Sequence, residues 1–119
     1  MLRKALIGKI HRARVTGADL NYEGSIEIDE TLLKLSGMAP YEYVEIYNIT
    51  TGGRFSTYII VGPSDSGNVI LNGAAARLVQ INDEVIITAY GYIDQEALFR
   101  HQPRVILVDA ANRPIPIED

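Results

Sequence analysis

Short apolar blocks, rich in isoleucine and valine, recur along the whole chain. They occupy residues 6–10, 26–28, 44–49, 55–61, 69–71, 85–89 and 105–108. β-branched runs of this length favour strands over helices. Turn signals separate them, among them Gly52-Gly53, the glycine- and serine-rich residues 62–67, and Asn82-Asp83. The pattern predicts a closed or nearly closed β structure.

Short helices are predicted where a capping residue precedes a helical run. The expected helices are 30–36 after Asp29, 73–79 after Asn72, and 95–100 after Asp94. Gly37 is placed to end the first of them, and Pro103 follows the last. The tail, residues 112–119, contains Pro114 and Pro116 and is expected to lie extended along a surface or to be loose.

The composition is that of an ordinary soluble domain. The chain has 119 residues and a mass of 13.1 kDa, with 47% hydrophobic and 22% charged residues, which predicts a single domain over residues 1–119. It contains no cysteine, which excludes a disulfide framework, a thiolate metal site and a cysteine nucleophile.

The charge balance and the first residues narrow the expected partners. A net charge of −4 and a pI near 5.1 have the wrong sign for general binding to a phosphate backbone, so nucleic acid is not an expected partner. Lys9 breaks the first apolar run before a signal-peptide core can form, and no later apolar stretch approaches membrane-spanning length. We therefore expect a cytoplasmic protein with no membrane partner.

The dipeptide Gly24-Ser25 stands before a predicted strand and, taken alone, would be a simple turn. Other segments accompany it and change that interpretation. The segments of interest are 9–12 (KIHR), 22–29 (YEGSIEID), 48–58 (NITTGGRFSTY) and 72–76 (NGAAA). In this order and at this spacing they resemble the pyruvoyl-dependent aspartate 1-decarboxylases. The resemblance runs from Met1 to about Ala89 and fades beyond Tyr90.

This resemblance implies a fold, an assembly and a reaction. The implied fold is a double-psi β-barrel, mainly β with a few short helices. The implied assembly is a homotetramer with its sites between subunits. The implied reaction is the decarboxylation of L-aspartate to β-alanine and carbon dioxide, which feeds pantothenate and hence coenzyme A biosynthesis.

The resemblance also implies a precursor that cuts itself between Gly24 and Ser25, into residues 1–24 and 25–119. The Ser25 hydroxyl would attack the preceding carbonyl. Glycine, which has no Cβ, would let the backbone adopt a strained conformation and leave that carbonyl open. The ester would then lose the Ser25 α-proton and eliminate Gly24 as a carboxylate, and the remaining dehydroalanine would hydrolyse to a pyruvoyl group and ammonia. The sequence leaves open whether maturation is spontaneous or needs a helper protein.

A pyruvoyl group made from Ser25 is the implied cofactor, with neither a metal nor pyridoxal phosphate. Its ketone would form a Schiff base with the substrate amine and accept the electrons released with carbon dioxide. Tyr58 matches the residue that then donates a proton, and a phenol keeps its proton at neutral pH. Without the resemblance, Tyr58 would be interpreted as an ordinary strand tyrosine.

Cationic residues are the implied holders of the substrate carboxylates. Arg54 is the best clamp, because a guanidinium matches the planar fork of a carboxylate. Lys9 is the second implied cation, and His11 shares its side if the strand is regular. Taken alone, all of them would be solvated surface groups; the resemblance favours a site role for Arg54 and Lys9 and leaves the two interpretations of His11 balanced. Tyr22 would either line the same site or be a packed aromatic.

Further roles follow from the family alone. Thr57 matches the residue that bonds the Gly24 carbonyl oxygen during cleavage, an oxyanion-type role, and it is also an implied substrate contact. Amide and helix-start N–H groups would face the substrate carboxylate or the pyruvoyl group. The residues implied to supply them are Asn72, Gly73, Ala74 and Ala75.

Thr57 and Tyr58 pose a geometric problem, because neighbours on a regular strand point to opposite faces. Either a bulge re-aims one of them, or the two act in different sites of an oligomer whose subunits complete each other's pockets. The implied tetramer favours the second explanation.

The chain departs from the family at Tyr47, where members often carry Trp, and at Asn82-Asp83, where the usual turn is Gly-Asp. If Tyr47 lies at the wall of the site, the pocket is slightly altered. Asn tolerates left-handed conformations, so the turn at Asn82 is expected to survive.

Two other functions are compatible with these residues. One is a non-catalytic β-barrel binding or assembly module that does not process itself. The other is a pyruvoyl enzyme that acts on a different amino acid. Self-cleavage separates the first from the decarboxylase, and a survey of amino acid substrates separates the second.

Overall fold

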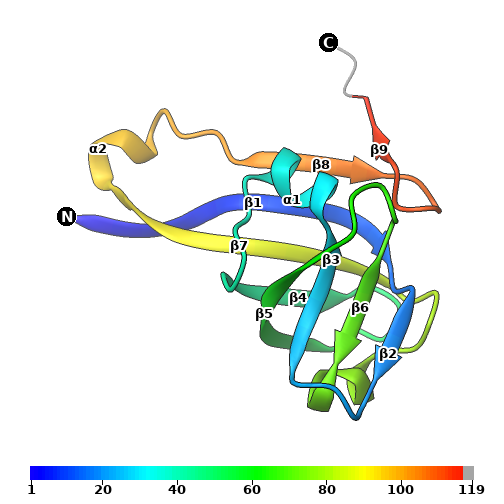
Figure 1. Cartoon of the computed structure of the whole chain (residues 1–119). Helices are drawn as coiled ribbons and strands as arrows, with labels where there is room; N and C mark the ends of the chain where they lie inside the picture. Colours follow the sequence, from blue (N-terminus) through cyan, green and yellow to red (C-terminus); the bar gives the residue numbers. More distant parts are fainter. Residues whose placement is uncertain (117–119) are drawn as a thin grey trace.

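A nine-stranded sheet dominates the computed structural model, which describes residues 1–116 (Figure 1). Its strands are β1 (Leu2–Arg14), β2 (Gly17–Asp19), β3 (Ser25–Asp29), β4 (Tyr43–Asn48), β5 (Arg54–Gly62), β6 (Val69–Asn72), β7 (Glu84–Asp94), β8 (Arg104–Val108) and β9 (Pro114–Ile115). The helical segments are α1 (Glu30–Ser36), the 3₁₀ helix η1 (Gly73–Leu78) and α2 (Gln95–Leu98). The expected mainly β class is confirmed.

The sheet mixes antiparallel and parallel pairs and coils round on itself. Its order is β2-β6-β3-β5-β4-β7-β1-β8-β9, with β3–β5, β2–β6 and β1–β8 parallel. The link from β1 to β2 ties distant parts of this order together, because the Val15 amide donates to the Asp83 carbonyl at 3.0 Å and the Thr16 amide to the Val69 carbonyl at 2.8 Å. The result is the closed β structure that the apolar pattern predicts.

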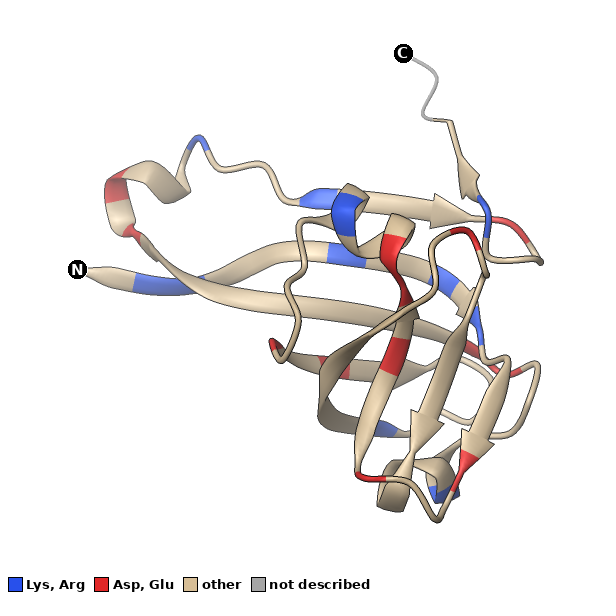
Figure 2. Cartoon of the chain, in the orientation of Figure 1, with Lys and Arg blue, Asp and Glu red and all other residues tan. Residues whose placement is uncertain are grey.

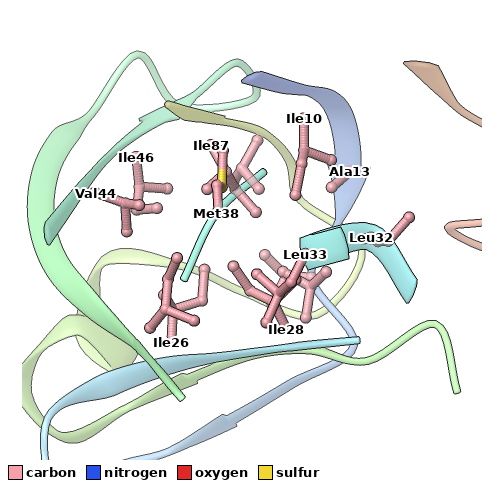
Figure 3. Close-up of a cluster of buried hydrophobic side chains, with 14 of the residues drawn as sticks. Ile10, Ala13, Ile26, Ile28, Leu32, Leu33, Met38, Val44, Ile46 and Ile87 are labelled. Carbon is pink, nitrogen blue, oxygen red and sulfur yellow. The ribbon is translucent and has the colours of Figure 1, made fainter. Parts of the chain in front are cut away.

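The hydrophobic core fills the inside of this coiled sheet (Figure 3). Side chains from β3, β5 and β6 meet there in register, since Ile26 lies opposite both Ile59 and Leu71, and all of them are fully buried. Because side chains alternate along a strand, the residues on either side of Ile26 face away from the core. Ser25 is one of those residues.

Every predicted strand matches an observed one, although 44–49 extends one residue beyond β4; β2 and β9 were not predicted. They have three and two residues, too few for an alternating pattern to be recognised. Pro114 and Ile115 pair with β8, as expected for a tail extended along a surface. Asn112, just before them, is buried and bonds the Arg14 and Gly67 carbonyls through its amide at 2.8 Å each. The end of the predicted tail, 117–119, lies outside the described residues.

The helix predictions are right for α1 and partly wrong for the others. Asp29 caps α1 through the Thr31 amide at 2.8 Å, and Gly37 ends it with a φ of 73°. The predicted helix 73–79 is instead a 3₁₀ helix without a side-chain cap. The predicted helix 95–100 stops at Leu98, after which the backbone continues only in i→i+3 turns. No helix within residues 1–116 is long and apolar enough to cross a membrane.

The Asp29 carboxylate ties the end of β3 to the loop before β6. It is buried and accepts backbone N–H bonds from Thr31 at 2.8 Å, Asp65 at 2.9 Å and Gly67 at 2.8 Å. The Gly67 donor is buried and would otherwise be left without a partner, which is costly. The carboxylate therefore fixes one end of the strand that begins with Ser25.

We predict that Asp29→Ala lowers the free energy of unfolding by about 3 kcal/mol, because a helix cap and two further backbone bonds, one of them buried, are lost together. Denaturant unfolding followed by circular dichroism measures the change. The matched control is Asp94→Ala, which removes the exposed cap of α2 and its single bond to the Glu96 amide. Its loss should be about 1 kcal/mol, and equal losses in both variants would contradict the tie that we assign to Asp29.

Candidate active site

Ser25 opens β3 and is held between two partners. In the β3–β6 ladder it lies opposite Asn72, whose Nδ2 donates to Ser25 Oγ at 3.1 Å. Ser25 Oγ in turn donates to the Glu23 carbonyl at 3.1 Å. Both Ser25 and Asn72 are buried, with 1% and 4% of their surface exposed. The expected capping role of Asn72 is wrong, because its amide is directed to the serine across the ladder and not to the helix behind it.

Gly73 presses against the backbone that precedes Ser25. A Cβ on Gly73 would lie 2.7 Å from Gly24 Cα and 2.8 Å from Gly24 N, and Gly73 has a φ of 68°. Gly24 itself does not have a positive φ, and a Cβ there would meet nothing within 4 Å. The strained backbone expected at Gly24 is therefore wrong. The left-handed conformation belongs to Gly73, while open space borders Gly24.

Tyr58 lies beside Ser25 on the neighbouring strand. The β3–β5 pair is parallel with Ile26 opposite Ile59, so the preceding residues, Ser25 and Tyr58, are neighbours on the outer face. The Tyr58 ring packs against that of Tyr41 at a centroid distance of 6.3 Å and an interplanar angle of 33°. Tyr41 was not a predicted site residue, and nothing in its spacing marks it, since it reaches Tyr58 from the turn before β4 with a φ of 66°.

Thr57 and Tyr58 do point to opposite faces. The β4–β5 register runs without a shift from Tyr43 opposite Tyr58 to Tyr47 opposite Arg54. A bulge that re-aims either side chain is therefore excluded in this pair, and that explanation is wrong. Thr57 lies half-buried on the face of Ile59, opposite Val44, while Tyr58 is partly exposed.

The remaining residues near Ser25 belong to η1 and to the preceding loop. Ala74 is exposed, and Ala75 is half-buried against the core. Tyr22 is 56% exposed, so it is not a packed interior aromatic of this chain. It lines a hollow of about 390 Å³ on the outer face of β3 and β5, together with Glu27, Pro40, Tyr41, Ile60 and Val61.

The predicted cations are not brought to Ser25 within one chain. Between β3 and β1, which carries Lys9 and His11, the sheet order places β5, β4 and β7. Figure 2 shows the basic positions of β1 on a strand distant from the start of β3. Arg54 shares β5 with Tyr58 but precedes it by four residues, about 13 Å along the strand.

Lys9 and His11 lie on the same side of β1, as expected. They pair with Val105 and Leu107 of β8 without a shift, although the pairing to β7 is interrupted beyond Ile10. Burial lowers the pKa of His11 below its usual value, and the nearby positive charge of Lys9 lowers it further. His11 is therefore favoured as a neutral imidazole, beside a lysine and not beside the serine.

Arg54 and Tyr47 form a stacked pair on the outer face. The guanidinium carbon of Arg54 lies 4.3 Å from the centre of the Tyr47 ring. The Tyr47 hydroxyl lies 2.8 Å from that of Tyr90 and donates to Glu45 Oε1 at 3.2 Å. The hydrogen bond with Tyr90, followed by burial, raises the pKa of Tyr47 to about 12. Neither Tyr90 nor Glu45 was a predicted site residue. In the sequence, Tyr47 stands out only because it departs from the family pattern.

The other departure behaves as expected. Asn82 has a φ of 79°, the left-handed conformation that asparagine tolerates better than most residues. Its amide donates to the Val15 carbonyl at 2.8 Å, and the Asp83 amide donates to the Gln80 carbonyl at 3.0 Å. The turn before β7 is thus formed without the glycine.

A comparison with solved structures bears on the fold alone. The rationally designed protein mkDPBB_sym_86, a double-psi β-barrel, aligns with a TM-score of 0.51 at 14% identity, covering 66% of this chain and 92% of the designed one. The expected double-psi barrel is confirmed.

Comparisons of sequence identify the family. A family model described as aspartate decarboxylase matches residues 1–115. An aspartate 1-decarboxylase of Syntrophobacter fumaroxidans is 52% identical over 115 residues, which cover 97% of this chain and 93% of that protein. One of Caldicellulosiruptor bescii is 49% identical over 119 residues, covering 100% of this chain and 93% of that protein. We expected the similarity to fade beyond Tyr90, and that expectation is wrong, because the match includes β8 and β9. Because the match runs through every strand of the sheet, this chain belongs to the aspartate decarboxylase family.

Proposed function

We propose that this protein decarboxylates L-aspartate to β-alanine and carbon dioxide, the step that supplies β-alanine for pantothenate. The observation that carries the proposal is the placement of the Ser25 hydroxyl, which is bonded by Asn72 and follows a glycine that Gly73 contacts closely. Relatives of about half-identical sequence over nearly their full length, named aspartate 1-decarboxylase, support the same reaction.

The first chemical event is cleavage between Gly24 and Ser25. Ser25 Oγ attacks the Gly24 carbonyl carbon, the peptide C–N bond breaks, the hydroxyl proton passes to the freed Ser25 amine, and the acyl group moves to oxygen as an ester. The hydrogen bond to the Glu23 carbonyl directs the hydroxyl proton away, and the Asn72 amide supports negative charge that develops on Oγ. Thr57, which faces away from Tyr58, is proposed to bond the Gly24 carbonyl oxygen of a neighbouring subunit. Loss of the α-proton then releases the Gly24 carboxylate, and water replaces nitrogen to leave a ketone and ammonia.

The residues around Ser25 fit a pyruvoyl group at the start of residues 25–119. Asn72 Nδ2 is a donor within hydrogen-bond distance of the Ser25 side chain, and the absence of a side chain on Gly73 lets the Gly24 backbone lie against it. The group supplies an electrophilic ketone that takes up the substrate amine and accepts the electrons released with carbon dioxide. Asn72, with the N–H groups of Gly73, Ala74 and Ala75, orients the substrate.

Tyr58 is proposed as the proton donor for the carbon that loses carbon dioxide. Its strand position beside Ser25 and its partly exposed ring put a phenol on the same outer face as the serine. A positioned acid of this kind contributes typically 10²- to 10⁴-fold to a rate.

Arg54, Lys9 and His11 are proposed to come from a second subunit of a homotetramer. The support is the distance that separates them from Ser25 within one chain. The outer face around Tyr58 also carries exposed apolar side chains that a partner subunit would cover. These include Tyr22, Tyr41, Tyr43 and Val61.

We predict that the purified protein consists of residues 1–24 and 25–119, the larger piece blocked at its N-terminus, and that Ser25→Ala stays uncut and inactive. Intact-mass analysis measures both. Ser64→Ala, which removes an exposed hydroxyl bonded to Glu30, is the matched control and should be cut normally. A wild-type chain that stays whole after long incubation contradicts the proposal, and carbon dioxide release from several amino acids contradicts the choice of aspartate.

Tyr58→Phe should be cut normally yet decarboxylate aspartate about 10²- to 10⁴-fold more slowly, because only the proton donor is lost. Carbon dioxide release by the fully cut variant measures the rate. Tyr92→Phe, at an exposed position of β7, is the control with unchanged activity. An uncut Tyr58→Phe, or a cut and fully active one, removes the role that we assign to the phenol.

Gly73→Ala should slow cleavage about 100-fold, since its Cβ displaces the Gly24 backbone and misplaced reacting groups are costly. Gly52→Ala is the matched control, because its φ of 82° carries the same left-handed strain but its Cβ would meet nothing within 4 Å. Time courses of cleavage after synthesis compare the two. Equal rates would show that the contact with Gly24 is irrelevant.

A further inference from the structure

Arg54 has an aromatic partner but no acidic one. Its guanidinium lies over the Tyr47 ring, and within residues 1–116 no carboxylate forms an ion pair with it. The side chain is exposed at the start of β5. An arginine held by its flat face keeps its fork of N–H donors available for a ligand.

A carboxylate is nevertheless close along the sheet. Glu45 pairs with Ser56 and Tyr47 pairs with Arg54, so Glu45 and Arg54 are diagonal neighbours on the same face of β4 and β5. Diagonal neighbours are within reach of each other when their side chains are long. Glu45 instead accepts the hydroxyl of Tyr47 at 3.2 Å.

Tyr90 fixes the ring that makes both contacts. Its hydroxyl lies 2.8 Å from that of Tyr47, and the ring of Tyr90 has the Lys4 ammonium 5.7 Å from its centre. A phenol is protonated at neutral pH, and the hydrogen bond with Tyr90 raises the pKa of Tyr47 further, so its hydroxyl continues to donate to Glu45.

We propose that Tyr47 is a positioning residue for substrate binding: its ring face holds the Arg54 guanidinium, and its hydroxyl occupies Glu45, so that Arg54 stays unpaired for a carboxylate of aspartate. This inference rests on the proposed function, in which Arg54 is the carboxylate clamp. Tyr47 does not touch the reacting atoms in this arrangement. It acts by keeping a competing carboxylate of the same chain away from the clamp.

The test is steady-state kinetics with L-aspartate on fully cut enzyme. Tyr47→Leu removes both contacts and should raise KM about tenfold with little change in kcat, as expected for lost binding. Adding Glu45→Gln to Tyr47→Leu should recover most of that rise, because the competing charge is gone. Tyr47→Phe keeps the ring and should raise KM only about threefold. Tyr92→Leu, on the exposed part of β7, is the matched control and should leave KM unchanged.

Two outcomes overturn the inference: a KM of Tyr47→Leu within about twofold of the wild type, or a raised KM that Glu45→Gln does not lower. Loss of packing alone predicts the second outcome, which is why the double variant decides. If Tyr47→Leu does not fold, Tyr47→Phe with and without Glu45→Gln gives the same comparison. A wild type that is uncut, or that is cut but inactive on aspartate, fails the proposed function instead, and intact mass measured on each sample separates the two failures.

Discussion

The pairing of β3 with β6 sets Ser25 opposite Asn72, and the candidate site is built outward from that register. Core burial fixes it, since Ile26, Leu71 and Ile59 all point inward from neighbouring strands. A slip by one residue would turn the serine into the core and the isoleucines into solvent, at a large cost in buried apolar area. Packing that has no chemistry of its own thus determines where the reactive hydroxyl stands.

The same register explains why two glycines have different tasks. Asn72 ends β6 beside Ser25, so the chain must turn away immediately, and Gly73 does so with a positive φ against the Gly24 backbone. Gly24 has open space at its own Cβ position. Gly73 must approach the Gly24 backbone closely, whereas Gly24 must stay accessible on its open side. A side chain at Gly73 would prevent the close approach.

Most of the strands and α1 were predictable from local pattern, because β-branched runs and the Asp29 and Gly37 caps act over a few residues. The site was less so. The sequence around Asn72 is typical of a helix cap. Only the pairing of β3 with β6 shows that its side-chain amide donates to Ser25 Oγ instead. The neighbourhood of Ser25 and Tyr58, 33 residues apart, depends on a parallel pairing that no local signal encodes. The roles came from family resemblance, and the stack of Tyr47 on Arg54 came from the fold.

The pairing of β1 and β2 with later strands bears on the two-piece protein that the proposed cleavage would produce. Residues 1–24 contain β1, which pairs with β7 and β8, and β2, which pairs with β6. The shorter piece is therefore hydrogen-bonded to three strands of the longer one. Severing the backbone before Ser25 therefore leaves the barrel assembled by non-covalent bonds alone. Once such a protein is denatured, its two pieces must find each other again, so its recovery becomes bimolecular and depends on dilution.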